Sequence, residues 1–320
     1  MSTLFMGLDA GGTSTRALLA TGSGRVVGRG QAAGANAWSS GAPPAAAIAS
    51  AAGDALGSHD PASIAGGVIA VAGGVSSVPE QAAAVIRAWH DLGIAVEPRI
   101  ILDVVAAFAA GTAEPRGLVL AAGTGAVAAL VDDGELVRRA GGRGWLVGDE
   151  GSAVWLGIEG VRAALLALDG RGPETELRAS IASALEVTAR ADVATAMTDV
   201  VYAGSPAALG RLAPLVVSAA GGGDEVAGSL LEAAVSHLVG TGLAAAGDED
   251  PEVVVLAGSL LAHVPSLGGR VRSEMALRWP SARIAESASG EAGATALAIR
   301  WSQGKRASDS ALEALGIGRP

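Results

Sequence analysis

The fold of this chain is decided by the stretch Leu8-Asp9-Ala10-Gly11-Gly12-Thr13-Ser14-Thr15-Arg16. The apolar run 4–8 leads into it and predicts a buried strand, and residues 15–20 predict a second strand. The two glycines let the backbone turn tightly and approach a ligand without a Cβ in the way. Because the pattern is strand, glycine turn, strand, it excludes the dinucleotide-binding motif, which needs a helix behind the turn.

A second copy of this motif decides between two interpretations of the turn. A hairpin rich in free N–H groups and hydroxyls can cradle a phosphate, but a hairpin without a ligand fits the first copy equally well. Residues 118–131 repeat strand, Gly-Thr turn and strand, and a later turn glycine follows the threonine by 11 residues in one copy and 10 in the other. Two such hairpins indicate a duplicated domain with a nucleotide held between the halves.

The composition limits what this chain can do. Its 320 residues favour two domains, and half of them are apolar, with aromatics at only 3%, so the core consists of small side chains. The net charge of −10 argues against nucleic acid or an anionic membrane as a partner. A nucleotide site in so acidic a protein must therefore rely on backbone N–H groups and a metal ion.

Two residue types are nearly or wholly absent. The only lysine, Lys305, lies near the end of the sequence, which excludes a P-loop and a protein-kinase fold. The chain has no cysteine, which excludes disulfides, thiolate catalysis, zinc–cysteine sites and iron–sulfur clusters. No signal peptide is evident, and the apolar stretch 117–131 contains the second glycine turn, so we expect a cytoplasmic protein without a membrane span.

Periodicity and turn residues predict the remaining elements. Helices are expected at 44–56, 79–92, 104–110, 154–168 and 290–301, with a mostly helical insertion at 173–243. Further strands are expected at 25–29, 66–71, 99–103, 252–256 and 281–285, a linker at 113–117, and a polar, partly mobile tail from 302.

Two acidic positions stand where ligands gather. Asp103 ends a predicted strand, and ligands of open α/β sheets collect beyond the carboxyl ends of strands. A helix N-cap is the plainer interpretation and is compatible with a site. The loop 141–152 holds five glycines around Asp149 and Glu150. A cap needs neither so many glycines nor two adjacent carboxylates, so this loop favours a binding site.

Six motifs in sequence order carry a family resemblance. They are Leu8-Asp9-Ala10-Gly11-Gly12-Thr13, Gly34-Ala35-Asn36-Ala37-Trp38, Ile101-Leu102-Asp103, Ala122-Gly123-Thr124-Gly125, Val147-Gly148-Asp149-Glu150-Gly151-Ser152 and Leu256-Ala257-Gly258-Ser259. The set resembles the N-acetylglucosamine kinase branch of the actin-like, sugar-kinase and heat-shock ATPase superfamily, the group known as BadF/BadG/BcrA/BcrD ATPases. The resemblance implies an α/β fold of duplicated actin-like (ribonuclease H-like) ATPase domains, with mixed sheets flanked by helices and a cleft between two lobes. The expected domains are 1–115 and 116–320.

The resemblance also implies an activity and its residues. The γ-phosphate of ATP would pass to the 6-hydroxyl of an amino sugar, with N-acetylglucosamine expected, and the partners would be ATP, Mg²⁺ and the sugar. Asp103 would be the catalytic base and Asp9 would hold the magnesium ion. The phosphates would contact Gly11, Gly12, Thr13, Gly123, Thr124 and Gly125, the adenosine would contact Gly258 and Ser259, and the sugar would contact Asn36, Asp103, Gly144, Trp145 and Asp149.

Two departures from the family pattern leave the sugar open. Ala35 stands where the family often has threonine, and Arg143 stands where its glycine loop often has tryptophan. Glucosamine, N-acetylmuramic acid and other hexoses therefore remain alternative acceptors. A homodimer is a further possibility that the sequence leaves open. Two other functions occur with this fold. An activator of acyl-CoA dehydratases needs cysteines for its iron–sulfur cluster, and this chain has none. A sugar-sensing regulator would want a DNA-binding helix-turn-helix before the first strand, and only three residues precede Leu4 here.

Overall fold

The computed structural model describes residues 3–35, 44–73, 78–303 and 309–318. Two five-stranded sheets organise it, one with the order β3-β2-β1-β4-β5 and the other with the order β10-β9-β6-β7-β8. The strands are β1 (Leu4–Ala10), β2 (Ser14–Thr21), β3 (Val26–Ala33), β4 (Ile64–Val71), β5 (Arg99–Leu102), β6 (Arg116–Ala122), β7 (Ala126–Asp132), β8 (Glu135–Gly141), β9 (Val253–Ala257) and β10 (Arg283–Glu286).

The two sheets have the same topology. In each, three consecutive strands form an antiparallel meander, and two later strands join in parallel beside the first of the three. Strand β1 therefore corresponds to β6, β4 to β9, and β5 to β10. The duplicated α/β fold with mixed sheets, expected from the two glycine hairpins, is confirmed.

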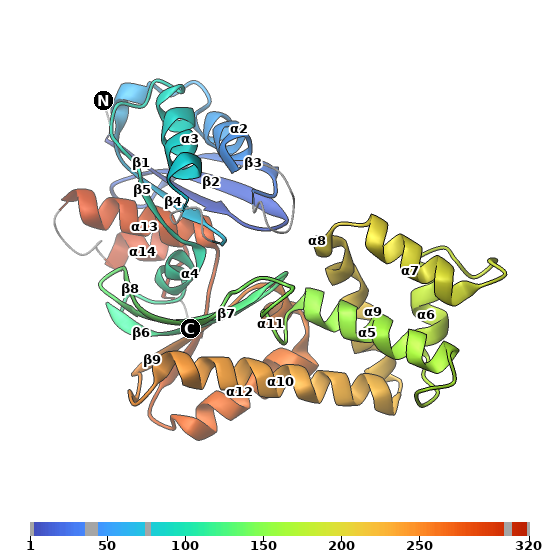
Figure 1. Ribbon diagram of the computed structural model, residues 1–320. Helices are drawn as coiled ribbons and strands as arrows, with labels where there is room; N and C mark the ends of the chain where they lie inside the picture. Colours follow the sequence, from blue (N-terminus) through green and yellow to red (C-terminus); the bar gives the residue numbers. More distant parts are fainter. Residues whose placement is uncertain (1–2, 36–43, 74–77, 304–308, 319–320) are drawn as a thin grey trace.

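The helices form layers around these sheets. Helices α2 and α3 cover the outer face of the first sheet, α10 and α12 cover the outer face of the second, and α4 and α13 lie between the sheets (Figure 1). The helices are α2 (Pro44–Leu56), α3 (Pro79–His90), α4 (Asp103–Gly111), α5 (Ala153–Leu168), α6 (Leu177–Ala184), α7 (Val193–Ala203), α8 (Pro206–Leu209), α9 (Ala213–Gly221), α10 (Glu225–Ala246), α11 (Ser259–His263), α12 (Pro265–Arg278), α13 (Gly290–Gln303) and α14 (Asp309–Ala314).

The middle layer joins the two halves of the chain. Helix α4 packs against β6 and β9 of the second sheet, while α13, from the other half, packs against β1 and β4 of the first. Val104 and Phe108 of α4 share one apolar cluster with Ala294 and Leu297 of α13. The boundary between 115 and 116 stays a prediction, and β6 begins inside the expected linker at Arg116.

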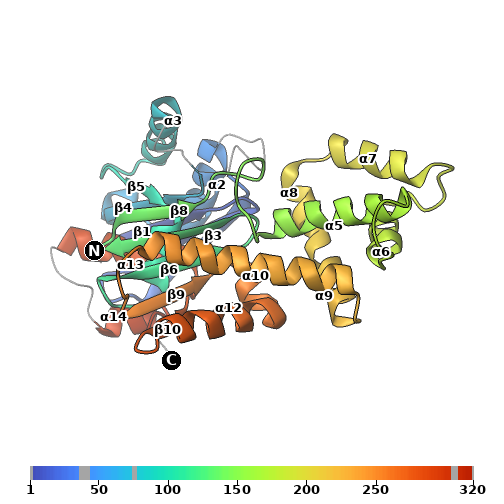
Figure 2. The same ribbon diagram turned by 60° about the horizontal axis from the view of Figure 1, so that its bottom comes forward.

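A helical arm projects from the second sheet. Helices α5 to α9 extend to one side in both views (Figures 1 and 2), and helices α6 to α10 occupy most of the segment 173–243, which the sequence predicts to be a mostly helical insertion. Among the described residues, α10 alone is long and apolar enough to cross a membrane by length and composition. A core helix passes the same test, and α10 packs against β6, β7 and β8.

The tail differs from expectation. We expected a polar, partly mobile end from residue 302, but the described part of it forms α14 and buries Ala311, Leu315 and Ile317. These three apolar side chains anchor the segment, because their burial removes hydrocarbon surface from water.

Candidate functional site

The carboxyl ends of three parallel strands bring two acids to one edge of the first sheet. Strand β1 runs parallel to β4, with Asp9 beside Ala70, and β4 runs parallel to β5, with Val71 beside Leu102. Asp9 is the next-to-last residue of β1, and Asp103 is the first residue of α4. Both therefore lie where the parallel strands end. This is the edge where ligands of α/β sheets bind.

Asp103 is not the N-cap that the plainer interpretation suggested. Leu102 occupies the N-cap position, and Asp103 is the first residue of α4, where its Oδ1 accepts a hydrogen bond from Val104 N at 2.9 Å. Burial raises the pKa of Asp103, and the Asp149 charge raises it further, while the hydrogen bond from Val104 and the charge of Arg139 oppose that shift.

Asp149 comes from the glycine loop between β8 and α5, and it is not a cap either. Ser152 caps α5 by accepting a hydrogen bond from Trp155 N at 3.1 Å. Asp149 has a left-handed backbone, with φ of 59°, and its Oδ1 accepts from Gly144 N at 3.3 Å. A side-chain carbon at Gly125 would lie 2.7 Å from Asp149 Oδ2, so this carboxylate lies against the second glycine turn.

Electrostatics show that the three acids share one site. The pKa of Asp9 is raised to about 7 by burial first, then by the charges of Asp103 and Glu291, with Arg16 opposing. Asp103 in turn responds to the charge of Asp149. Coulomb energies fall with distance and are screened by water, so the effect of Asp103 on Asp9 and that of Asp149 on Asp103 each require proximity. We call Asp9, Asp103 and Asp149 the acidic group. They come from the end of β1, the start of α4 and the glycine loop before α5.

Both glycine turns lie beside this acidic group. In the first, Gly11 N donates to Ser14 O at 3.0 Å, and Ala35 N donates to Gly11 O at 3.0 Å. Gly12 lies against Gly34, and the Thr13 side chain is exposed at the tip. Thr15, by contrast, is buried and donates to Ala33 O at 2.8 Å, which is a structural role.

The second turn is tied to the start of α5. Gly123 N donates to Gly125 O at 2.9 Å, Ala153 N donates to Gly123 O at 2.9 Å, and Val154 N donates to Thr124 O at 3.4 Å. The same helix follows the loop that carries Asp149, so the turn and the loop both join the start of α5.

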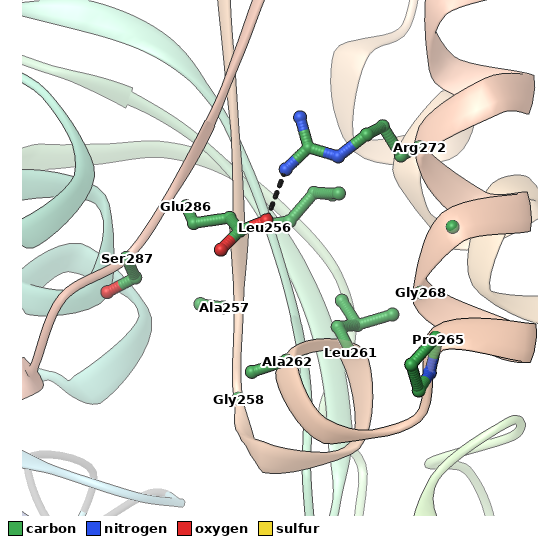
Figure 3. Close-up of a pocket in the computed structure, with 11 residues that line it drawn as sticks. Leu256, Ala257, Gly258, Leu261, Ala262, Pro265, Gly268, Arg272, Glu286 and Ser287 are labelled. Carbon is green, nitrogen blue, oxygen red and sulfur yellow. Dashed lines mark hydrogen bonds and ion pairs between the residues drawn. The ribbon is translucent and has the colours of Figure 1, made fainter. Parts of the chain in front are cut away.

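A pocket of about 250 Å³ opens next to the second turn. It lies between the end of β9, helices α11 and α12, and the end of β10 (Figure 3). Arg272 closes one side by donating to Glu286 Oε1 at 2.6 Å and to Ile284 O at 3.1 Å. Gly258 lines the pocket, and a side-chain carbon at Gly123 would lie 3.6 Å from Ser259 Oγ, so the second turn lies beside the start of α11.

Two of the expected sugar contacts stay predictions, one because it is not described and one because no described contact joins it to the acidic group. Asn36 lies outside the described residues. Trp145 stands in the glycine loop and is 38% exposed, next to Leu146 and Val147, which are more exposed still. No hydrogen bond described for this part of the chain joins the Trp145 ring to the acids. Gly144 does reach the group, through its N–H on Asp149.

Three charged residues at the site escaped the sequence interpretation. Arg16 lies directly across the hairpin from Asp9, a position that the register of the first turn could have revealed. Arg139, on β8, acts on Asp103 from the second sheet, and no local sequence signal marks it. Glu291 lies in the first turn of α13, where an acid is usual for helical reasons alone.

The acidic group does not form a closed metal cage. In the described part of the chain, no set of three or more His, Cys, Asp or Glu side chains is arranged to hold a metal ion. Magnesium is commonly held by one or two carboxylates together with water and substrate phosphates. The residues therefore fit a metal that arrives with a nucleotide.

Comparisons with known proteins identify the family of this chain. The model of the BadF/BadG/BcrA/BcrD ATPase family matches residues 6–295. An N-acetylmuramic acid/N-acetylglucosamine kinase from Clostridium acetobutylicum is 32% identical over 94 residues, 29% of this chain and 31% of that protein. An N-acetyl-D-glucosamine kinase from Dictyostelium discoideum is 30% identical over 169 residues, 52% of this chain and 53% of that protein.

The chain thus matches about a third of one curated relative and about half of the other. Among solved structures, a candidate N-acetylglucosamine kinase from Chromobacterium violaceum has a TM-score of 0.72 at 24% identity, covering 93% of this chain and 99% of that one. This likeness shows that the two proteins have the same fold.

Proposed function

Since the chain belongs to the BadF/BadG/BcrA/BcrD ATPase family, as its motifs indicated, we propose that it is an ATP-dependent sugar kinase. It transfers the γ-phosphate of ATP to the 6-hydroxyl of an amino sugar, with N-acetylglucosamine as the acceptor. The observation that carries the proposal is the acidic group Asp9, Asp103 and Asp149, which lies beside both glycine turns. Phosphoryl transfer needs mainly positioning and charge neutralisation, and this group with its two turns supplies both.

The nucleotide lies across the second sheet and reaches the first. The adenosine occupies the pocket lined by Gly258, whose neighbour Ser259 lies beside the second turn at Gly123. The turns Gly11–Thr13 and Gly123–Gly125 offer N–H groups and hydroxyls to the β- and γ-phosphates from opposite sides. Backbone donors of this kind bind anions without a lysine, which suits a chain whose only lysine is Lys305.

Asp9 would hold the magnesium ion. Burial and two neighbouring carboxylates raise its pKa to about 7, and a cation at this point would relieve that repulsion. When bound, the ion neutralises charge on the phosphates. The glycine turns hold the phosphates in position, and Asp103 accepts the proton of the sugar hydroxyl.

Asp103 is the catalytic base. It accepts the proton of the sugar 6-hydroxyl as that oxygen forms a bond to the γ-phosphorus, and the bond between the γ-phosphorus and the β–γ bridging oxygen breaks to release ADP. The hydrogen bond from Val104 N holds one oxygen of Asp103 in place, which leaves the other available to the hydroxyl. Asp149 and the loop residue Gly144, whose N–H donates to it, bind the sugar, and the family resemblance adds Asn36 and Trp145 as further sugar contacts.

Arg143 bears on which substituent the sugar carries. Arg143 is exposed next to Gly144, in the loop that carries Asp149. An arginine here could bind a carboxylate such as the one that N-acetylmuramic acid carries, and one relative bears both that sugar and N-acetylglucosamine in its name. Glucosamine and other hexoses are the remaining alternatives.

A coupled ADP assay tests the proposal. The protein is incubated with ATP and Mg²⁺, alone and with N-acetylglucosamine, glucosamine, N-acetylmuramic acid or glucose. We expect ADP release that depends strictly on sugar and is fastest with N-acetylglucosamine. ADP release that is independent of every sugar, or no release at all, contradicts the proposal, and a preference for N-acetylmuramic acid that Arg143→Ala removes would identify the alternative acceptor.

A further inference from the structure

One buried carboxylate at the site has an oxygen that no described residue binds. Glu291 is only 6% exposed, and its Oε2 has no hydrogen-bond partner among the described residues. A buried polar atom without a partner is rare and costs free energy, and an ionised one costs more. Such an atom calls for an explanation, and a ligand that is absent from the polypeptide itself is one.

The position of Glu291 points to Asp9. Helix α13 packs on β1, and a side-chain carbon at Gly290, the residue before Glu291, would collide with the Asp9 carboxylate. The first turn of α13 therefore lies directly against the carboxylate that ends β1. The charge of Glu291 also acts on Asp9 and helps to raise its pKa.

The duplication of the fold gives an independent reason. Helix α4 follows β5 in the first half as α13 follows β10 in the second, and the two helices pack together between the sheets. Asp103 is the first residue of α4 and Glu291 is the second residue of α13. Both halves thus place a carboxylate in the first turn of the equivalent helix, and the charge of each acts on Asp9.

On the basis of the proposed kinase function, we propose that Glu291 is a second carboxylate, beside Asp9, that holds the divalent cation of the metal–nucleotide complex. Its unpartnered Oε2 accepts from a metal-bound water or binds the cation itself. Two carboxylates plus phosphate oxygens and water make a donor set that magnesium favours. A bound cation would also offset the repulsion that the charge of Glu291 exerts on Asp9 in the free protein.

The experiment measures metal binding rather than turnover. Mn²⁺ is titrated into the full-length protein with a non-hydrolysable ATP analogue, and free Mn²⁺ is followed by electron paramagnetic resonance. We expect Glu291→Gln, which keeps the shape and removes the charge, to weaken Mn²⁺ binding by about tenfold to a hundredfold, as lost metal-site partners commonly do. The matched control is Glu313→Gln, an exposed glutamate on α14, which should bind Mn²⁺ like the wild type.

Two further measurements keep the result interpretable. Affinity for the analogue in EDTA should stay within about twofold for Glu291→Gln, because Glu291 acts through the cation. Glu291→Ala serves as a second variant, with circular dichroism to verify its fold, and Asp9→Asn marks the effect of losing the other carboxylate.

The possible outcomes separate this inference from the kinase proposal. Mn²⁺ binding within twofold of wild type in both Glu291 variants, with weakened binding in Asp9→Asn, overturns the role of Glu291 and leaves the kinase intact. Loss of analogue binding in EDTA would also overturn it, since Glu291 would then act on the nucleotide itself. A wild-type protein that binds no metal–nucleotide complex refutes both.

Discussion

Replacing Asp9 by asparagine should stabilise the ligand-free protein even though it removes the proposed metal ligand. The pKa of Asp9 is raised from 3.8 to about 7 by burial and by the neighbouring charges of Asp103 and Glu291. A carboxyl whose pKa is higher in the folded state favours folding when protonated, so its contribution is complete below pH 3.8 and is lost as the pH rises through about 7. Near neutral pH, the charged Asp9 therefore weakens the fold.

The size of the effect follows from the two pKa values. Ionisation of Asp9 costs the fold about 2 kcal/mol at pH 5 and about 4 kcal/mol at pH 8, at roughly 1.4 kcal/mol per pKa unit. Asparagine cannot ionise, so the advantage of Asp9→Asn over wild type should grow by about 2 to 3 kcal/mol between these pH values. At about 2 to 4 °C per kcal/mol, that is a gap of several degrees in Tm.

The assay is thermal unfolding in EDTA at pH 5 and pH 8, followed by circular dichroism. Asp54→Asn, an exposed aspartate on α2, is the control and should follow the wild type at both pH values. Addition of Mg²⁺ and an ATP analogue should raise the Tm of the wild type more than that of Asp9→Asn, since ligand binding stabilises only the form that binds it. An Asp9→Asn variant whose advantage is the same at both pH values would refute the reasoning.

Three further predictions concern turnover and affinity. Asp103→Asn should lower kcat by about 10²- to 10⁴-fold, the range for a lost general base, with sugar binding only moderately weaker; near-normal turnover would exclude Asp103 as the base. Thr13→Val and Thr124→Val should each raise the apparent KM for ATP several-fold, since hydrogen bonds to charged groups contribute about 1.5 to 3 kcal/mol, and an effect confined to the sugar KM would contradict their placement. Gly125→Ala should displace the Asp149 carboxylate, which lies 2.7 Å from the position of the added carbon, and should raise the KM for sugar more than for ATP in the coupled assay.

The parts of the fold with strong local signals were predictable from sequence. Apolar runs and turn residues predicted the strands of the two glycine hairpins. The similarity of these hairpins predicted the repeated topology of the sheets. The position of Asp103 followed from the same logic, because a residue after a parallel strand reaches the ligand edge wherever that strand stands in the sheet.

The parts that depend on packing between distant segments were not predictable. Nothing in residues 290–303 shows that α13 crosses to the first sheet, because its apolar surface would fit either sheet equally well. Glu291 therefore looked like an ordinary acid in a first helical turn, and only the packing of α13 on β1 brings it to Asp9. The burial of the tail was missed for a similar reason. Leu315 and Ile317 join an apolar cluster whose other members are distant in the sequence.

The most direct test of the central claim is to identify the product. The protein is incubated with ATP, Mg²⁺ and N-acetylglucosamine, and the mixture is analysed by phosphorus and carbon NMR spectroscopy. The account predicts equal amounts of ADP and a sugar phosphomonoester whose phosphorus is coupled to carbon 6. Inorganic phosphate in place of the sugar phosphate, or a phosphorus on any other carbon, would contradict it.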